Sequence, residues 1–170
     1  MPQILLTLIL FDAAAIVYAF VLGLDLGDAV PVSDHLLAGM LASFLLIFTH
    51  VLIIFYLIGT GIDIREAVEA DEVHAKKYIT LTRRLKKRVF PWACFSILLI
   101  IVAALLGAEV HSRLISVSTG ASLPLRQVGG WWFHLVFVLL ALGVNSIALV
   151  VEFRAVSLNR RAIEEINSAV

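Results

Sequence analysis

The strongest structural signal in the chain is residues 36–58, which read LLAGMLASFLLIFTHVLIIFYLI. One histidine and a few hydroxyl groups are the only polar side chains in this stretch. A helix of about 20 apolar residues crosses the hydrocarbon core of a bilayer. Residues 3–24, 92–110 and 131–153 are comparably apolar. The sequence therefore predicts an all-α integral membrane protein with four transmembrane helices.

The connections between these stretches predict how the helices are arranged. The longest polar connection, residues 59–91, is too short to build a core of its own, so residues 1–170 form a single membrane domain. Apolar residues recur among its charges at helical spacing, which predicts an amphipathic, helical cytoplasmic segment. We expect the second span to end at Gly59-Thr60-Gly61, which is a helix-stop or hinge signal, and the third helix to begin near Pro91. With short connections, an antiparallel four-helix bundle is the natural packing.

Basic residues are distributed very unevenly and predict the orientation. Residues 59–91 contain eight Lys or Arg and the tail after residue 153 contains three, against only Arg113 and Arg126 in the two remaining loops. Cytoplasmic loops carry the excess of basic residues, so both termini should lie in the cytoplasm. We expect a bacterial cytoplasmic membrane, with the basic run 83–88 contacting anionic headgroups rather than nucleic acid.

Three polar residues are predicted to lie at a similar depth inside the membrane. Asp12, His50 and Asn145 each fall about 12–15 Å from the cytoplasmic interface at 1.5 Å per helical residue. Because an ionisable side chain at that depth must face the bundle and be paired, we expect a buried layer in which Asp12 accepts a hydrogen bond from His50. Such a layer either holds the helices in register or takes part in proton transfer or ligand binding.

The fourth apolar stretch carries a polar stripe. His134, Asn145 and Glu152 are separated by 11 and 7 residues, which places them on one side of a helix. A polar stripe along a membrane helix points toward partners or water inside the bundle. Glu152 is near the inner boundary, where it either continues this stripe or lies among the headgroups.

Three histidines are predicted near the outer face. His35 precedes the second stretch, His111 follows the third, and His134 lies one turn inside the fourth. Three converging imidazoles would bind a metal ion, and two from facing helices would ligate the iron of haem b. The alternative is that these are ordinary interfacial histidines.

In outline, the chain resembles four-helix membrane b-type cytochromes, such as the anchor subunits of quinone-linked oxidoreductases. The resemblance rests on the number of spans and on the intramembrane histidines, and it includes no specific motif. Dihaem members of that group place histidine pairs near both membrane faces, whereas the inner half of this chain has only His50. The resemblance therefore implies at most one haem b, near the outer face.

These observations lead to two functional hypotheses. The first is a small membrane subunit, redox-linked or accessory in a larger respiratory-type assembly, that binds one haem b or a quinone and associates with other membrane subunits or a second copy. The second is a small proton-coupled transporter or channel that uses the Asp12, His50 and Asn145 layer. An enzyme is least favoured, because the sequence has no nucleophile–base, HExxH or phosphate-loop motif.

Overall fold

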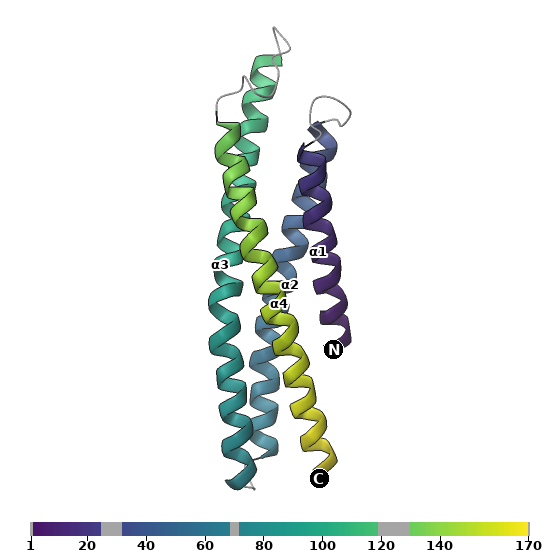
Figure 1. The fold of residues 1–170 in the computed structure, drawn as a ribbon, viewed down its shortest axis with the longest axis vertical. Coiled ribbons are helices and arrows are strands. Elements are labelled where there is room, and N and C mark those ends of the chain that lie inside the picture. Colours follow the sequence, from purple (N-terminus) through teal and green to yellow (C-terminus); the bar gives the residue numbers. More distant parts are fainter. Residues whose placement is uncertain (1, 25–31, 69–71, 119–129, 170) are drawn as a thin grey trace.

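The computed structural model describes residues 2–24, 32–68, 72–118 and 130–169, and its four elements are helices. In chain order they are α1 (Pro2–Leu24), α2 (Val32–Ala67), α3 (Glu72–Ser118) and α4 (Trp131–Ala169). Each helix packs antiparallel against the next, and α4 also contacts α1 (Figure 1). The predicted antiparallel four-helix bundle is therefore confirmed, and all four helices are long and apolar enough to be candidate membrane spans. Most of both predicted outer loops lies outside the described residues.

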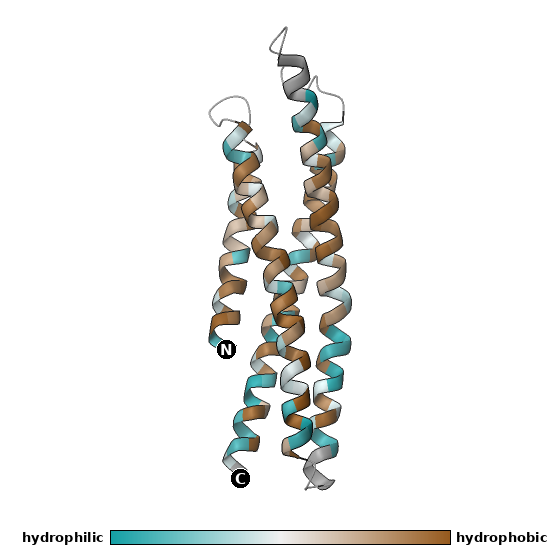
Figure 2. Ribbon diagram, turned by 180° about the vertical axis from the view of Figure 1, so that it is seen from behind, coloured by the Kyte–Doolittle hydropathy of each residue, from teal (hydrophilic) through white to brown (hydrophobic). Residues whose placement is uncertain are grey.

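Three of the helices are much longer than a membrane span. α2, α3 and α4 contain 36, 47 and 39 residues, whereas α1 contains 23. At 1.5 Å per residue the long helices extend roughly 54–70 Å, about twice the hydrocarbon thickness of a bilayer. Most of the surplus projects at one end, beyond the N-terminus of α1 (Figure 1), where the ribbon becomes largely hydrophilic (Figure 2). We call this projection the stalk; it comprises residues 59–68, 72–91 and 154–169.

The predicted ends of the second and third helices are wrong. α2 continues through Gly59-Thr60-Gly61 to Ala67, and Pro91 lies inside α3. Glycine weakens a helix by only about 1 kcal/mol, and proline removes one backbone hydrogen bond. Packing in the stalk offsets these local costs, so the helices run on from the membrane without a break.

The stalk has a hydrophobic core of its own. Its buried residues come from all three long helices: Ile64, Val68, Tyr78, Ala162 and Ile166. At its surface Lys77 forms an ion pair with Glu165, with 3.2 Å between Nζ and Oε2, and the Tyr78 hydroxyl donates to the same oxygen at 3.0 Å. The Tyr78 hydroxyl and the Lys77 ammonium together lower the pKa of the Glu165 carboxyl. The predicted helical segment is therefore a hairpin that packs against the C-terminal end of α4.

The membrane-embedded core is tightest in the middle of the molecule. There, one cluster draws buried side chains from all four helices, including Ile9, Leu46, Ile100 and Leu149. Toward the loop end, the pair α1–α2 diverges from the pair α3–α4 (Figure 1). The buried cluster described at that end contains Leu99, Ala103 and Ala141, which all belong to α3 and α4. The two helical hairpins are thus joined firmly at mid-height and less closely at the loop end.

The stalk core supplies a test of this packing. Replacing Ile64, which is 3% exposed, with alanine leaves a cavity and should destabilise the protein by about 2–4 kcal/mol. Ile62 lies two residues earlier and is 53% exposed, so Ile62→Ala should have little effect. Thermal unfolding of both variants in mild detergent measures the difference. Equal melting temperatures for the two variants would contradict a packed stalk.

Candidate functional site

His35 and His134 face each other near the loop end of the bundle. His35 lies in the first turn of α2 and His134 in the first turn of α4, and both side chains are half-buried. Their ring centroids are 6.4 Å apart and their ring planes are inclined by 72°. Two of the three histidines predicted at the outer face are therefore brought together from different hairpins.

Hydrogen bonds fix the tautomer of both rings. Nδ1 of His35 lies 3.1 Å from the Ala19 carbonyl oxygen, and Nδ1 of His134 lies 3.0 Å from the Ala103 carbonyl oxygen. A carbonyl only accepts, so each Nδ1 must carry the proton and donate it. In a neutral imidazole the other nitrogen is then a lone-pair base. Within the described part of the chain, neither Nε2 has a hydrogen-bond partner.

A glycine makes room for each ring. A Cβ atom on Gly23 would lie 2.8 Å from Cε1 of His35, and a Cβ atom on Gly107 would lie 2.8 Å from Cε1 of His134. Each glycine is four residues after the alanine whose carbonyl accepts the histidine hydrogen bond. Because a side chain at residue i covers the carbonyl four positions earlier, glycine exposes that carbonyl to the ring. The α1–α2 and α3–α4 hairpins thus carry the same Ala, Gly and His arrangement.

His111 does not belong to the pair. It lies on α3 one turn beyond Gly107, and its Nδ1 is buried without a hydrogen-bond partner among the described residues. No group of three or more His, Cys, Asp or Glu side chains in the described ranges is placed to hold a metal ion. The three-histidine metal site considered from the sequence is therefore not formed by these residues.

A second polar group lies in the middle of the bundle, around His50. His50 Nδ1 is 2.7 Å from Oε1 of Glu152, and His50 Nε2 is 3.0 Å from Oδ1 of Asn145. All three side chains are fully buried. The expected hydrogen bond from His50 to Asp12 is not formed, because Glu152 and Asn145 on α4 occupy both ring nitrogens. Glu152 therefore lies inside the bundle and not among the headgroups.

The contacts around His50 determine where protons must lie. The Asn145 amide nitrogen donates to the Ala141 carbonyl at 2.8 Å, so its oxygen faces His50 and Nε2 must donate to it. A proton must also separate Nδ1 from Oε1, since two lone pairs do not approach to 2.7 Å. The pair is thus either imidazolium with carboxylate or imidazole with carboxylic acid. In both forms the pair carries no net charge, which suits a fully buried site.

Asp12 is the least satisfied member of the layer. It is fully buried, and neither carboxyl oxygen has a hydrogen-bond partner among the described residues. The Thr49 hydroxyl is close enough to interact with Asp12, but the two groups do not meet hydrogen-bond geometry. His50 and Glu152 lie within electrostatic range of the same carboxyl group. Asp12, His50, Asn145 and Glu152 are thus buried neighbours, and His50 contacts both Asn145 and Glu152.

Further polar side chains lead from this layer toward the stalk. Asn159 is 1% exposed and donates from Nδ2 to the Thr60 hydroxyl at 2.8 Å, and Thr60 in turn donates to the Tyr56 carbonyl at 2.7 Å. On α4, Asn145, Glu152 and Asn159 recur every seven residues, which keeps them on one side of the helix. The polar stripe predicted for this helix therefore continues into the stalk.

Comparison of the chain with protein-family models, with curated protein sequences and with solved structures finds no match. The assignment of function therefore depends on the geometry of these two sites.

The His50–Glu152 contact predicts an unusually sensitive position. Glu152→Ala leaves His50 buried with an unpaired nitrogen, and we expect a loss of about 3–5 kcal/mol in stability. Glu152→Gln keeps a hydrogen-bonding group and should lose less. Glu164→Ala removes an exposed partner of Arg160 and serves as the control. Thermal unfolding in detergent ranks the three variants, and a Glu152→Ala protein as stable as Glu164→Ala would show that the buried pair is not formed.

Proposed function

We propose that this chain is a membrane b-type cytochrome subunit in which His35 and His134 are the two axial ligands of a single haem b. The observation that carries the proposal is the pair of facing imidazoles, 6.4 Å apart between centroids, whose Nδ1 protons are both engaged by backbone carbonyls. A metal-ligating histidine typically donates its other ring N–H to a carbonyl or carboxylate, and both rings meet that requirement.

The spacing of the rings fits a single iron between them. An imidazole nitrogen lies about 2 Å from a metal ion that it ligates, and the ring centre lies about 1 Å further away. Two imidazoles on opposite sides of one iron therefore have centroids roughly 6 Å apart, close to the observed 6.4 Å. An edge-to-face contact between aromatic rings also falls in this range. The tautomers favour the iron, because each ring donates through Nδ1 and keeps a lone pair on Nε2 that a metal ion can accept.

The number of ligands favours a macrocycle over a bare ion. A protein-bound transition metal usually takes four or more ligands, and the described residues bring only two histidines together. Haem supplies the remaining four nitrogens itself and needs two axial ligands from the protein. A quinone is less well matched, because its carbonyl groups accept hydrogen bonds and neither free Nε2 has a proton to donate.

The surrounding residues have defined tasks in this proposal. Gly23 and Gly107 let each ring lie against the neighbouring helix, and the Ala19 and Ala103 carbonyls hold the ring orientation. Bound haem supplies reversible one-electron transfer at this place in the membrane.

The distribution of basic residues supports an orientation for the subunit. Eleven of the thirteen Lys and Arg residues lie in residues 59–91 or after residue 153, the regions that contain the stalk. By the positive-inside rule, the stalk and both termini lie in the cytoplasm, and the His35–His134 pair lies near the outer face of a bacterial cytoplasmic membrane. We infer that this subunit passes electrons to or from partner subunits in a respiratory-type assembly.

The proposal predicts a visible absorption spectrum. Protein purified in mild detergent from haem-replete cells should give the reduced-minus-oxidised difference spectrum of a low-spin b-type haem. His35→Ala and His134→Ala should each abolish the six-coordinate form, whereas Ser146→Ala, on the exposed side of α4, should leave the spectrum in place. A colourless wild-type protein that is otherwise folded would overturn the assignment.

The glycines provide a sharper test of the histidine positions. In Gly107→Ala the added methyl group would lie 2.8 Å from Cε1 of His134 and force the ring off the Ala103 carbonyl. Loss of a group that orients a metal ligand typically weakens binding about 10–100-fold, so we expect haem affinity to fall by that factor. Gly143 is an exposed glycine on the same helix as His134, with nothing within 4 Å of its Cβ position, and Gly143→Ala is the control. Titration of both apoproteins with haem measures the difference.

The layer around His50 supports a second candidate function, proton-coupled transport. Three ionisable side chains, Asp12, His50 and Glu152, are fully buried in the middle of the bundle, and Asn159 and Thr60 extend polar contacts toward the stalk. Intramembrane groups of this kind mark proton relays in pumps and transporters. Under this hypothesis the chain transports protons across the membrane, alone or as an oligomer, and the paired histidines near the loop end have a structural role.

Proteoliposomes separate the two candidates. If the layer conducts protons, an imposed potential should drive a pH change inside liposomes that contain the wild-type protein. Asp12→Asn should abolish this change while the protein remains folded. Ser146→Ala, on the exposed side of α4, is the matched control. Proton flux equal to that of empty liposomes would rule out this second candidate without affecting the haem proposal.

A further inference from the structure

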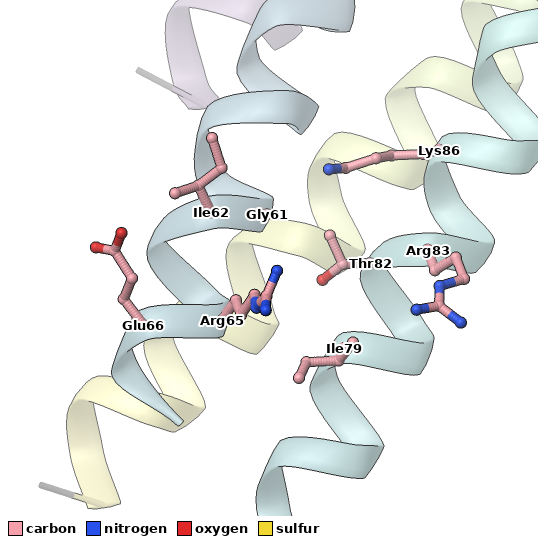
Figure 3. Close-up of a pocket in the computed structure, with 8 residues that line it drawn as sticks. All are labelled: Gly61, Ile62, Arg65, Glu66, Ile79, Thr82, Arg83 and Lys86. Atoms are coloured by element: carbon pink, nitrogen blue, oxygen red, sulfur yellow. The ribbon is translucent and has the colours of Figure 1, made fainter. Parts of the chain in front are cut away.

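A groove between α2 and α3 marks the place where the membrane-embedded part of the bundle meets the stalk (Figure 3). It encloses about 480 Å³, and the residues that matter for its chemistry are Gly61, Ile62, Arg65, Glu66, Arg83 and Lys86. Trp92 on α3 lies six residues beyond Lys86, about 9 Å along the helix. Since tryptophans concentrate at the membrane interface, the groove lies at the level of the lipid headgroups.

The charge in this groove is unbalanced. Three cationic side chains and one carboxylate line it, and no ion pair or hydrogen bond joins the side chains of Arg65, Arg83 or Lys86 to the described residues. Figure 3 shows the Lys86 ammonium reaching from α3 toward Gly61, and the Arg65 guanidinium reaching from α2 toward α3. Glu66 points away from both in the same view. Two cations from different helices therefore converge without an anion between them.

Gly61 allows this convergence. A Cβ atom at Gly61 would lie 2.6 Å from the Lys86 Nζ atom and 2.8 Å from Thr82 Cγ2. Without that atom, the Lys86 ammonium lies against the backbone of α2. Gly59, two residues earlier, has nothing within 4 Å of its Cβ position. Only one of the two glycines in Gly59-Thr60-Gly61 is therefore needed for close packing, and it is the one that faces the basic groove.

An apolar strip leads from the groove into the membrane. Phe55, Ile58 and Ile62 follow one another at intervals of three and four residues on α2, and they are 66%, 36% and 53% exposed. Their spacing places them on one side of the helix. A phosphate in the groove would thus lie at the end of a hydrocarbon-facing strip, which matches a phospholipid better than a soluble phosphate compound.

We propose that this groove is a specific binding site for the phosphate headgroup of an anionic phospholipid, with Arg65 and Lys86 contacting the phosphate and Gly61 forming the floor. Arg83 lies at the rim and adds positive charge. The lipid binds along α2, with its acyl chains against Phe55, Ile58 and Ile62. By joining α2 to α3, it stabilises the position at which both helices leave the membrane.

Native mass spectrometry of the intact, detergent-solubilised protein with added phosphatidylglycerol tests the proposal, with phosphatidylcholine as the zwitterionic reference. The double variant Arg65→Gln/Lys86→Gln should bind phosphatidylglycerol at least about tenfold more weakly than wild type, since each basic residue near an anionic surface contributes appreciably to binding. Arg84→Gln/Lys87→Gln removes the same charge from exposed positions outside the groove and should bind as wild type does. Equal weakening in both variants would show non-specific attraction and overturn the proposal.

A second variant guards against misfolding of the double variant. Gly61→Leu fills the groove without changing charge and should also lose phosphatidylglycerol, whereas Gly59→Leu should retain it. The melting temperature of each variant without lipid establishes that it is folded. Inorganic phosphate is added last, as a competitor of phosphatidylglycerol. If it displaces phosphatidylglycerol at equal concentration, the site recognises free phosphate and the lipid assignment is wrong.

Discussion

The structure depends on one constraint: polar side chains within the membrane must find partners inside the bundle, because the lipid supplies none. His50, fully buried, satisfies it with a carboxylate on one ring nitrogen and an amide on the other, both from α4. His35 and His134 satisfy it differently, by donating to carbonyls of the helices beside them. The first arrangement leaves no nitrogen free, whereas the second leaves a lone pair on each ring.

That difference separates the two polar sites chemically. The His50 group is closed, since both ring nitrogens are used and the His50–Glu152 pair is neutral in either protonation form. The His35–His134 pair is open, and it lies where the two hairpins diverge. The same histidine, carbonyl and glycine arrangement occurs in both hairpins, although the chain has no evident internal sequence repeat. A ligand between the hairpins would therefore meet equivalent surroundings on its two sides, as a haem with two axial histidines does.

Much of the fold was predictable from the sequence, because hydropathy reports directly on helices that cross a membrane. The four apolar stretches and their antiparallel packing were identified correctly. The helix ends expected at Gly59-Thr60-Gly61 and near Pro91 were predicted wrongly, because tertiary packing in the stalk outweighs local helix propensity there. Of the site, residue depth identified Asp12, His50 and Asn145 as neighbours but not the pairing of His50 with Glu152. The seven-residue spacing of Asn145 and Glu152 was the available signal.

The role of the glycines could not be predicted from the sequence. Gly23 and Gly107 belong to runs of small residues, a pattern that predicts close packing between helices in general. Only the structure shows that each one accommodates an imidazole ring. Likewise, the sequence placed His35, His111 and His134 near one face but could not select the facing pair, because selection requires the order in which the helices pack.

The most direct test of the account is the amount of haem b bound per chain, measured by pyridine haemochromogen assay on protein purified from haem-replete cells. One haem per chain is the predicted result, because among the described residues His35 and His134 are the two histidines brought together with a free Nε2 on each ring. No haem would contradict the cofactor assignment. Two haems per chain would also contradict it, because a second haem would require His50 to leave Glu152 and Asn145.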